Sequence, residues 1–522
     1  MPVFDKISSF CIKWYKWFLF AILIPLPSYS LMMVNQLTND VDGLWHGSIS
    51  YAGNHELGEG RWLWRYLDKA RLYLSPDPLT SFISLVLLAV SVILVLHLLE
   101  VESRIVIISA ILLFMINPTV GCFLSYRYMS PTFTMSVLLA ILAAFCCIKI
   151  KNPIVSTAVF AVILAMSMGL YQTHLGCAVQ LLVLDIVLGI YKGRYEIKEA
   201  LIRALRYIGS ICLGGILYIG IWNLELYRYG SEKSTYAGAD QYTVSDMILN
   251  LPHSFVYAWT SGVGFILSKH GRALVVPRML YVIAAILFLA AVICAFCRLV
   301  KESVGRAVWF LVFILLMPAA SGSVLFLAFD QGVQTQMTMP FVLLFIIMIY
   351  LTVLFTKDME IKKPDMKKTA VAVCALLAVI FTYGAHIQLQ YDEQAMYMGR
   401  QSMRTITEQI VDKLIAEDLY GHDHRYCFIG APSNNRMYIR NDVIEKANGY
   451  GKYGEILWDA KQSRLAWTTF FANEMGIDIR IVDEDVYQEF LDSEEVQQMP
   501  DFPAEGSVRE FDDCVVIKVA QW

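Results

Sequence analysis

The chain has 522 residues, of which 57% are hydrophobic and 17% are charged, and its mean hydropathy is +0.53. Soluble globular chains have about 45–50% apolar and about 25% charged residues, so this composition excludes an ordinary water-soluble enzyme. The formal net charge of −4 is close to neutral and argues against a basic nucleic-acid-binding protein. The composition therefore indicates an integral membrane protein.

The first apolar run, Phe18–Met33, follows Lys13 and Lys16 and in that respect resembles a signal peptide. It lacks a small-x-small cleavage motif, however, and Pro25 and Pro27 interrupt it. We interpret this run as an uncleaved first membrane span whose basic flank stays in the cytoplasm.

Apolar runs of similar length recur along the chain, and about 20 residues are needed to cross the hydrocarbon core of a bilayer. They predict about eleven spans, at residues 18–34, 80–99, 105–116, 131–148, 154–169, 175–191, 207–222, 277–297, 307–328, 340–356 and 369–386. The stretch Phe255–Leu267 could form a re-entrant or interfacial helix in addition.

Basic side chains gather in every second connection between these spans. The connections are those with Lys149 and Lys151, with Lys192 to Arg206, with Arg298 to Arg306, and with Lys357 to Lys368. The positive-inside rule places all of them in the cytoplasm together with the N-terminus. The loop of residues 35–79, here named the first loop, and the C-terminal segment 390–522, here named the tail, then lie outside the cell.

The tail is charged and alternates polar with apolar residues, unlike the rest of the chain. Its predicted elements are helices at Gln401–Leu419 and Ser463–Met475 and strands at Arg425–Gly430, Asp478–Val482 and Cys514–Val519. A segment of about 130 residues can bury a core of its own. We therefore predict an all-α polytopic membrane bundle over residues 1–389, followed by a small extracytoplasmic α/β domain over residues 390–522.

Two carboxylates, Asp40 and Asp42, stand just beyond the first span in the sequence NDVDG. An acidic side chain at the membrane surface can take a proton from an attacking hydroxyl, or it can bind a divalent cation. The spacing is equally compatible with solvated loop residues in which Asn39 or Asp40 caps a short helix. Asp40 and Asp42 are thus candidate catalytic residues, and a divalent cation is the one cofactor that the sequence leaves open.

Further along the first loop, Glu56 precedes the segment GEGRW, which contains Arg61 and Trp62. An arginine can bind a phosphate through two parallel N–H groups. The tryptophan could stack on a sugar or lie in the aromatic belt of the membrane interface. We predict that Glu56, Arg61 and Trp62 bind substrate.

Polar residues also interrupt the apolar sequence at the next two outer corners. Tyr126 and Arg127 precede one span, where the arginine is either a phosphate ligand or a snorkelling anchor. Tyr171, Gln172 and His174 form the next corner, and polar groups at membrane depth usually line a cavity. All five are candidate substrate-binding residues, although a lone histidine such as His174 is more often structural.

Other motifs are less specific. Asp330, with Gln331, Gln334 and Gln336, marks the fifth outer connection. His422-Asp423-His424 falls in a turn between a helix and a strand, so we assign no metal site to it. A Walker A loop, a GxSxG elbow, an HExxH helix and a credible GxGxxG turn are all missing from the sequence. Their absence argues against the common ATP-driven pumps and against a membrane metalloprotease.

Several of these motifs together resemble the GtrII-type bacterial glucosyltransferases, the serotype-converting family within the GT-C class of membrane glycosyltransferases. The resemblance lies in NDVDG at 39–43, GRW at 60–62, YRY at 126–128, GLYQ at 169–172 and FPAEGSV at 502–508. The middle of the chain, residues 223–360, carries little that matches.

The resemblance implies transfer of a sugar, glucose in this family, from a polyprenyl-phosphate donor to a cell-surface glycan on the outer face of the bacterial plasma membrane. In GT-C enzymes an acidic residue of the first outer loop is the catalytic base, which is Asp40 or Asp42 here; the sequence does not rank them. Arg61 and Arg127 would bind the donor phosphate. Tyr171 and Gln172 would line the groove for the sugar or lipid.

The main alternative is a transporter or flippase of lipid-linked sugars, which predicts charges near the middle of the membrane. Within the predicted spans such a charge is little more than Asp185, which lies near the inner end of its span. A sensor or assembly protein would explain the tail but not the Asp–Arg constellation. The gathering of polar residues at the outer rim favours an enzyme.

Overall fold

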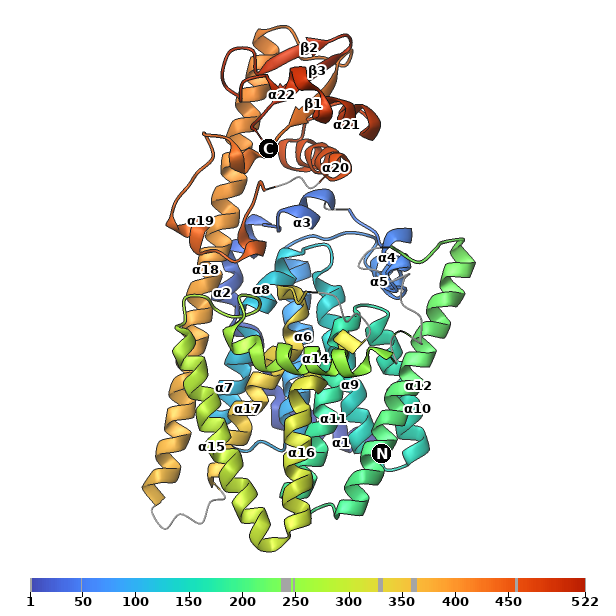
Figure 1. The fold of residues 1–522 in the computed structure, drawn as a ribbon, viewed down its shortest axis with the longest axis vertical. Helices are drawn as coiled ribbons and strands as arrows, with labels where there is room; N and C mark the ends of the chain where they lie inside the picture. Colours follow the sequence, from blue (N-terminus) through green and yellow to red (C-terminus); the bar gives the residue numbers. More distant parts are fainter. Residues whose placement is uncertain are drawn as a thin grey trace.

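A computed structural model describes residues 2–47, 49–235, 246, 249–326, 332–357, 364–455 and 459–521. Asp330 and Gln331 lie outside the described residues. Most of the chain forms upright helices, and a small mixed domain stands on one end of the bundle (Figure 1). A multi-pass membrane protein with an α/β tail therefore agrees with the described structure.

Each of the eleven predicted spans is helical in the described residues. The helices are α1 (Pro2–Leu23), α2 (Leu26–Asn35), α6 (Leu79–Leu98), α7 (Arg104–Met115), α8 (Pro118–Ser125), α9 (Ser130–Lys149), α10 (Pro153–Met168), α11 (Leu175–Tyr191), α12 (Ile197–Tyr229), α15 (Arg278–Glu302), α16 (Val304–Ser321), α17 (Met339–Lys357) and α18 (Pro364–Ala416). Eight are long and apolar enough to cross a membrane, or ten if two bent pairs each count as one span. The sixteen-residue α10 is a shorter apolar helix, so the number of spans stays a prediction.

The two bent pairs break where the sequence contains proline. The pair α1–α2 bends by 52° next to Pro25, because a proline supplies no backbone N–H for the helix ladder. The pair α7–α8 bends by 40° at Asn117 and Pro118. Asn117 caps α8 by accepting a hydrogen bond from the amide of Val120 at 3.1 Å. Helix α8 thus extends the short predicted span 105–116.

Two of the basic connections meet at one end of the bundle, around Glu100. Its carboxylate lies 3.8 Å from the amines of Lys149 and Lys192 and 3.7 Å from the guanidinium of Arg194. We name this the opposite end, because the first loop and the tail lie at the other end, the tail-side end (Figure 1). The shared location agrees with the predicted alternation of loops, while the cytoplasmic assignment itself stays a prediction.

The region Phe255–Leu267 lies within α14 (Leu251–Gly264) and a short 3₁₀ turn (Phe265–Leu267). Helix α14 runs across the upright helices (Figure 1). Gly262 lets it approach α16 closely, because a Cβ there would meet the carbonyl oxygen of Pro318 at 2.6 Å. The crosswise direction agrees with a re-entrant or interfacial helix.

The tail contains a three-stranded sheet in the order β1-β3-β2. Strand β1 (Arg425–Ile429) is parallel to β3 (Cys514–Lys518), and β2 (Val508–Phe511) is antiparallel to it. The helices of the tail are α19 (Asp442–Lys446), α20 (Ala460–Phe470), a π turn (Phe471–Met475), α21 (Glu484–Asp492) and α22 (Glu494–Gln497). The predicted strand Asp478–Val482 is wrong, since only an isolated bridge joins Ile481 to Tyr426.

The predicted amphipathic helix Gln401–Leu419 is the upper part of α18, which continues without a break from the last span (Figure 1). The proposed boundary between residues 389 and 390 therefore falls inside a helix. Ile406, Ile410 and Leu414 of the predicted apolar face are fully buried in the core of the tail. Leu44 of the first loop belongs to the same core, so the tail and the first loop share a hydrophobic interior.

Candidate functional site

The first loop contains three short helices, α3 (Val41–Trp45), α4 (Asn54–Gly58) and α5 (Trp64–Ala70). Its beginning is attached to the end of α8. The amide of Asn39 and the hydroxyl of Thr38 both donate to the carbonyl oxygen of Ser125, at 2.9 and 3.0 Å. This attachment brings the segments NDVDG and YRY together, although they are far apart in the sequence.

Asp42 lies in the first turn of α3 and is partly exposed. Burial raises the pKa of its carboxyl, while the charge of His46, a hydrogen bond with Tyr126 and the charge of Arg61 each lower it. His46 is itself stacked on the ring of Tyr128 at a centroid distance of 3.8 Å. Asp42 therefore shares its environment with two predicted substrate-binding residues, Tyr126 and Arg61.

Asp40 is buried, in contrast, and contacts the tail. One carboxylate oxygen accepts a hydrogen bond from the amide of Gly454 at 2.8 Å. The other oxygen is buried without a hydrogen-bond partner among the described residues. Burial raises the pKa of Asp40 to about 7; the Gly454 amide lowers it and the charge of Glu455 adds to the rise. Asp40 and Asp42 thus have different neighbours despite their spacing of two residues.

Arg61 follows a tight turn at Gly60, whose φ is +85°. Its guanidinium pairs with the carboxylate of Glu59 at 2.9 Å and lies 5.3 Å from the ring centroid of Tyr171. Gln172 supports the turn, because its side-chain amide donates to the carbonyl oxygen of Glu59 at 2.6 Å. The structure therefore brings together Arg61, Tyr171 and Gln172, three residues that the sequence analysis named separately as candidate ligands.

Trp62 is only 7% exposed and its ring lies against Gly169, where a Cβ would overlap it. The backbone supports the same contact, because the amide of Leu63 donates to the carbonyl of Gly169 at 2.8 Å. The aromatic-belt interpretation of Trp62 is therefore wrong: the ring is packed inside the protein, since Gly169 leaves it room.

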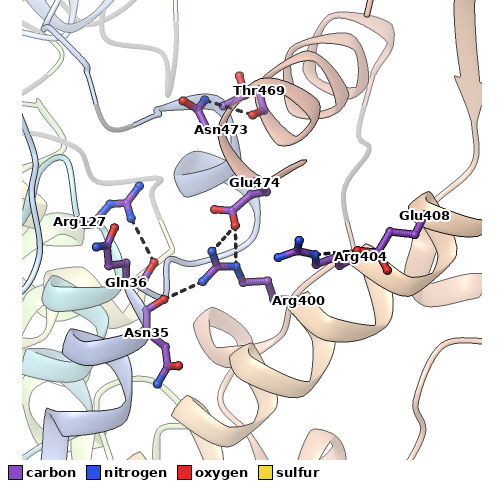
Figure 2. A network of polar contacts seen from close by, with 9 residues as sticks. All are labelled: Asn35, Gln36, Arg127, Arg400, Arg404, Glu408, Thr469, Asn473 and Glu474. Atoms are coloured by element: carbon purple, nitrogen blue, oxygen red, sulfur yellow. Dashed lines mark hydrogen bonds and ion pairs between the residues drawn. The ribbon is translucent and has the colours of Figure 1, made fainter. Parts of the chain in front are cut away.

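Arg127 is 6% exposed, and one guanidinium nitrogen donates to the carbonyl oxygen of Gln36 at 3.1 Å (Figure 2). The contact does not support the snorkelling interpretation, because the guanidinium is buried inside the protein against the end of α2. Its predicted role as a phosphate ligand is not tested by these contacts.

The remaining two predicted ligands have contacts that are mainly structural. Glu56 accepts a hydrogen bond from the amide of Gly53 at 2.6 Å and so caps α4. His174 is fully buried, with its ring 5.5 Å from Phe123 and 5.3 Å from Tyr171. Neither ring nitrogen has a hydrogen-bond partner among the described residues.

A family model described as "Glucosyl transferase GtrII" matches residues 47–355, which is more than half of the chain. The chain belongs to the GtrII glucosyl transferase family. Comparisons with curated proteins and with solved structures found no match. The match confirms the predicted resemblance, and it extends through the middle of the chain, where the sequence motifs alone gave little.

The GtrII match includes eight of the ten predicted site residues but begins after Asp40 and Asp42 and ends before the tail. Membership in the family implies a glucosyltransferase. It does not identify the base, the donor or the acceptor, which are addressed below as proposals.

The structure places beside the two aspartates further residues that sequence analysis did not single out. His46 and Tyr128 flank Asp42, and Gly454 of the tail contacts Asp40. Tyr128 was part of the YRY motif and could have been chosen from it. Gly454 lies more than 400 residues from Asp40 and has no local signal in the sequence.

The tail also covers the first loop through polar contacts. Arg400 of α18 donates to the carbonyl oxygen of Asn35 at 2.7 Å and pairs with Glu474 (Figure 2). The hydroxyl of Thr469 donates to the carbonyl oxygen of Trp45 at 3.4 Å. The tail therefore covers α3, next to Asp42.

A divalent cation would need several acidic, histidine or cysteine ligands close together. Within the part of the chain that the structure describes, no three such side chains form a group that could hold a metal ion. The donor set at Asp40 and Asp42 does not fit a metal site, and no chemical step is assigned to a metal here.

Proposed function

We propose that this protein transfers glucose from polyprenyl-phosphate glucose to a cell-surface glycan at the tail-side end of the bundle. In this proposal that end faces the outside of a bacterial plasma membrane, and the N-terminus is cytoplasmic. The GtrII match over residues 47–355 carries the glucosyl transfer. The long apolar helices support a donor with a lipid tail that lies in the bilayer.

Asp42 acts as the general base in this proposal. The acceptor hydroxyl attacks the anomeric carbon, its proton passes to the Asp42 carboxylate, and the bond between that carbon and the phosphate oxygen breaks. The lipid phosphate leaves as an anion and needs no proton. A single displacement of this kind inverts the anomeric centre.

Access favours Asp42 over Asp40 as the base. Asp42 is partly exposed and its charge interacts with Arg61, whereas Asp40 is buried and bonded to Gly454 of the tail. A general base must come within hydrogen-bond reach of the hydroxyl that it deprotonates. Asp40 then anchors the tail to the first loop.

Arg61 stabilises the departing phosphate in this proposal, because charge develops there as the sugar leaves. Its Nε is buried without a hydrogen-bond partner among the described residues, so it retains a donor for a ligand. Tyr171 and Gln172, which contact Arg61 and its neighbour Glu59, line the place for the glucosyl group. Arg127 is a weaker candidate, since it already donates to Gln36.

The transporter alternative receives no support from Asp185. Its carboxylate accepts hydrogen bonds from the hydroxyl of Tyr207 at 2.8 Å and from that of Tyr195 at 3.2 Å. These partners account for the charge without a transported ion or sugar.

The test is glucose transfer by the purified full chain from synthetic polyprenyl-phosphate glucose, measured beside Asp42→Asn and Asp40→Asn. We expect Asp42→Asn to lower turnover by at least about 100-fold, as for loss of a general base, and Asp40→Asn to retain most of it. The reverse order would make Asp40 the base. No release of lipid phosphate by the folded wild-type protein would overturn the proposal.

A further inference from the structure

A pocket of about 370 Å³ lies in the first loop beside the C-terminal end of α12. It is within the range of small-molecule sites, which is about 300–1,000 Å³. Its larger lining residues are Tyr51, Arg65, Lys69, Tyr73 and Tyr229, and the other lining residues are the short side chains of 52–54. The lining thus combines three aromatic rings with two cations and has no acidic residue. None of the residues proposed above for glucose transfer lines it.

Helix α5 fixes both cations on the pocket side. Arg65 and Lys69 are four residues apart and therefore share one face of the helix. On another face, Asp68 is buried and accepts hydrogen bonds from the indole of Trp64 at 3.1 Å and from the amide of Ala52 at 2.8 Å. Asp68 thereby ties the wall of the pocket at Ala52 to the helix that carries the cations.

Arg65 and Lys69 both retain N–H groups that can bind an anion. The guanidinium of Arg65 lies 4.0 Å from the ring centroid of Tyr229, and one nitrogen donates to the carbonyl of Gly53 at 3.1 Å. The other terminal nitrogen is buried without a partner among the described residues. The amine of Lys69 lies 5.7 Å from the ring of Tyr66 and forms no ion pair with any described residue.

The aromatic part of the pocket is open. Tyr51 is 68% exposed, and its ring lies 6.2 Å from that of Tyr73. Exposed tyrosine rings offer a flat apolar face and a hydroxyl, which suits the faces and hydroxyl groups of sugars. No aliphatic side chain larger than alanine lines the pocket, so it offers no groove for an acyl chain.

We propose that this pocket binds an acidic glycan, whose sugar units stack on the tyrosines while a carboxylate or phosphate group contacts Arg65 and Lys69. The proposal rests on the proposed function in one respect, because the glycan is taken to be the acceptor. Trp64 lies on another face of α5, with its ring 5.9 Å from Tyr128 and 6.0 Å from the guanidinium of Arg61. Trp64 and Arg65 are consecutive residues, about 100° apart around α5, so the pocket and the Asp42 environment flank the same short helix and a glycan of a few sugar units reaches both.

Direct binding to the full chain in detergent tests the proposal without any donor. The probes are an oligogalacturonate hexamer, which is acidic, and maltohexaose, which is neutral. We expect the wild-type protein to bind the acidic probe more tightly. Arg65→Gln should weaken that binding by roughly tenfold or more, because a charge-assisted hydrogen bond is lost. Lys69→Gln should weaken it several-fold, and the neutral probe should respond to neither variant.

Arg404→Gln is the matched control, because it also removes one cation from a half-exposed helix position, on α18. It should leave the binding of both probes unchanged. Lys69→Gln is the second pocket variant and should fold normally, since Lys69 is exposed and holds no other described element in place. Equal binding of the two probes by the wild-type protein, or binding that neither pocket variant alters, would overturn the proposal.

The headgroup of an anionic lipid is the other ligand that would bring a negative charge to Arg65 and Lys69. We would compare nanodiscs of phosphatidylglycerol with nanodiscs of phosphatidylcholine, using the same variants. If Arg65→Gln and Lys69→Gln reduced only the preference for phosphatidylglycerol, the pocket would be a lipid site and the glycan proposal would fail. Acidic-probe binding that persists in a protein without transfer activity would instead overturn the proposed function alone.

Discussion

The two ends of the helical bundle use charged residues differently. At the opposite end, Glu100 is surrounded by three cations from two connections, and these side chains are 30–51% exposed. At the tail-side end, Arg61, Arg127 and Asp40 are largely buried. Arg61 pairs with the carboxylate of Glu59, Arg127 donates to a backbone carbonyl, and Asp40 accepts from a backbone amide. Exposed ion pairs contribute little to stability, whereas burying a charge is costly unless it is paired and hydrogen-bonded. The proposed function places the chemistry at the end with the buried charges.

Replacing Arg61 is the strongest test of this difference between the two ends. We expect Arg61→Gln to lower glucose transfer by roughly 100-fold, because one preorganised donor to the developing phosphate charge is lost. The measurement is turnover with polyprenyl-phosphate glucose at saturating acceptor. Arg228→Gln is the control, since Arg228 is 63% exposed at the end of α12, and it should retain activity. Equal activity of the two variants would remove Arg61 from the site.

The contact between the tail and the first loop can be tested by replacing Arg400. Arg400→Gln should lower the free energy of unfolding by about 1–3 kcal/mol, because hydrogen bonds of a charged group to Glu474 and to the end of α2 are lost. Thermal unfolding and limited proteolysis of the tail would measure this. Arg404→Gln is the matched control one turn away, because Arg404 pairs with the half-exposed Glu408 and with no other acidic side chain among the described residues (Figure 2). Equal stability of the two variants would show that this contact does not hold the tail.

The buried Asp40 predicts a dependence of stability on pH. Its pKa is about 7 in the folded protein and about 3.9 in an unfolded chain. Between these values the folded state holds the extra proton, so the contribution of Asp40 to stability is largest below pH about 4 and is lost as the pH rises through 7. The melting temperature should therefore fall between pH 5 and pH 8.

Asp40→Asn should reduce this fall, because the amide keeps an acceptor for Gly454 but does not ionise. Asp442→Asn is the control, since Asp442 is 83% exposed, and it should behave like the wild type. A pH profile that Asp40→Asn leaves unchanged would contradict the burial argument.

The smallest effect is expected at the opposite end. Glu100→Gln should change the free energy of unfolding by less than about 1 kcal/mol, because its ion pairs are long and exposed. Glucose transfer should stay at the wild-type level. A large loss of activity in this variant would contradict the division of roles between the two ends.

Much of the bundle could be predicted from the sequence because its signals are local. Apolar runs of membrane length predicted the helices, and Pro25 marked the break between α1 and α2. The polar corners were recognised as such, and the structure brings two of them together at Arg61, Tyr171 and Gln172. The face of Ile406, Ile410 and Leu414 also followed from helical spacing.

The errors concern contacts that join distant segments. Trp62 and Arg127 look like interface residues until Gly169 and Gln36 are known to lie beside them. The Asp478–Val482 segment has strand-like residues but pairs at only one position. The bond from Gly454 to Asp40 closes a loop of more than 400 residues, and no local pattern encodes it. Because of that bond, Asp40 is buried against the tail while Asp42 stays partly exposed. The sequence alone could not rank the two as candidates for the base.

The 53 residues of α18 make a rod about 80 Å long at 1.5 Å per residue, which is far more than the roughly 30 Å of hydrocarbon that one span crosses. Its lower part belongs to the bundle and its upper part to the tail, without a hinge between them (Figure 1). The number of residues in this rod therefore sets both the height and the azimuth of the tail above the membrane. One inserted residue would raise the tail by about 1.5 Å and rotate it by about 100°. Either shift would separate Gly454 of the tail from Asp40 of the first loop.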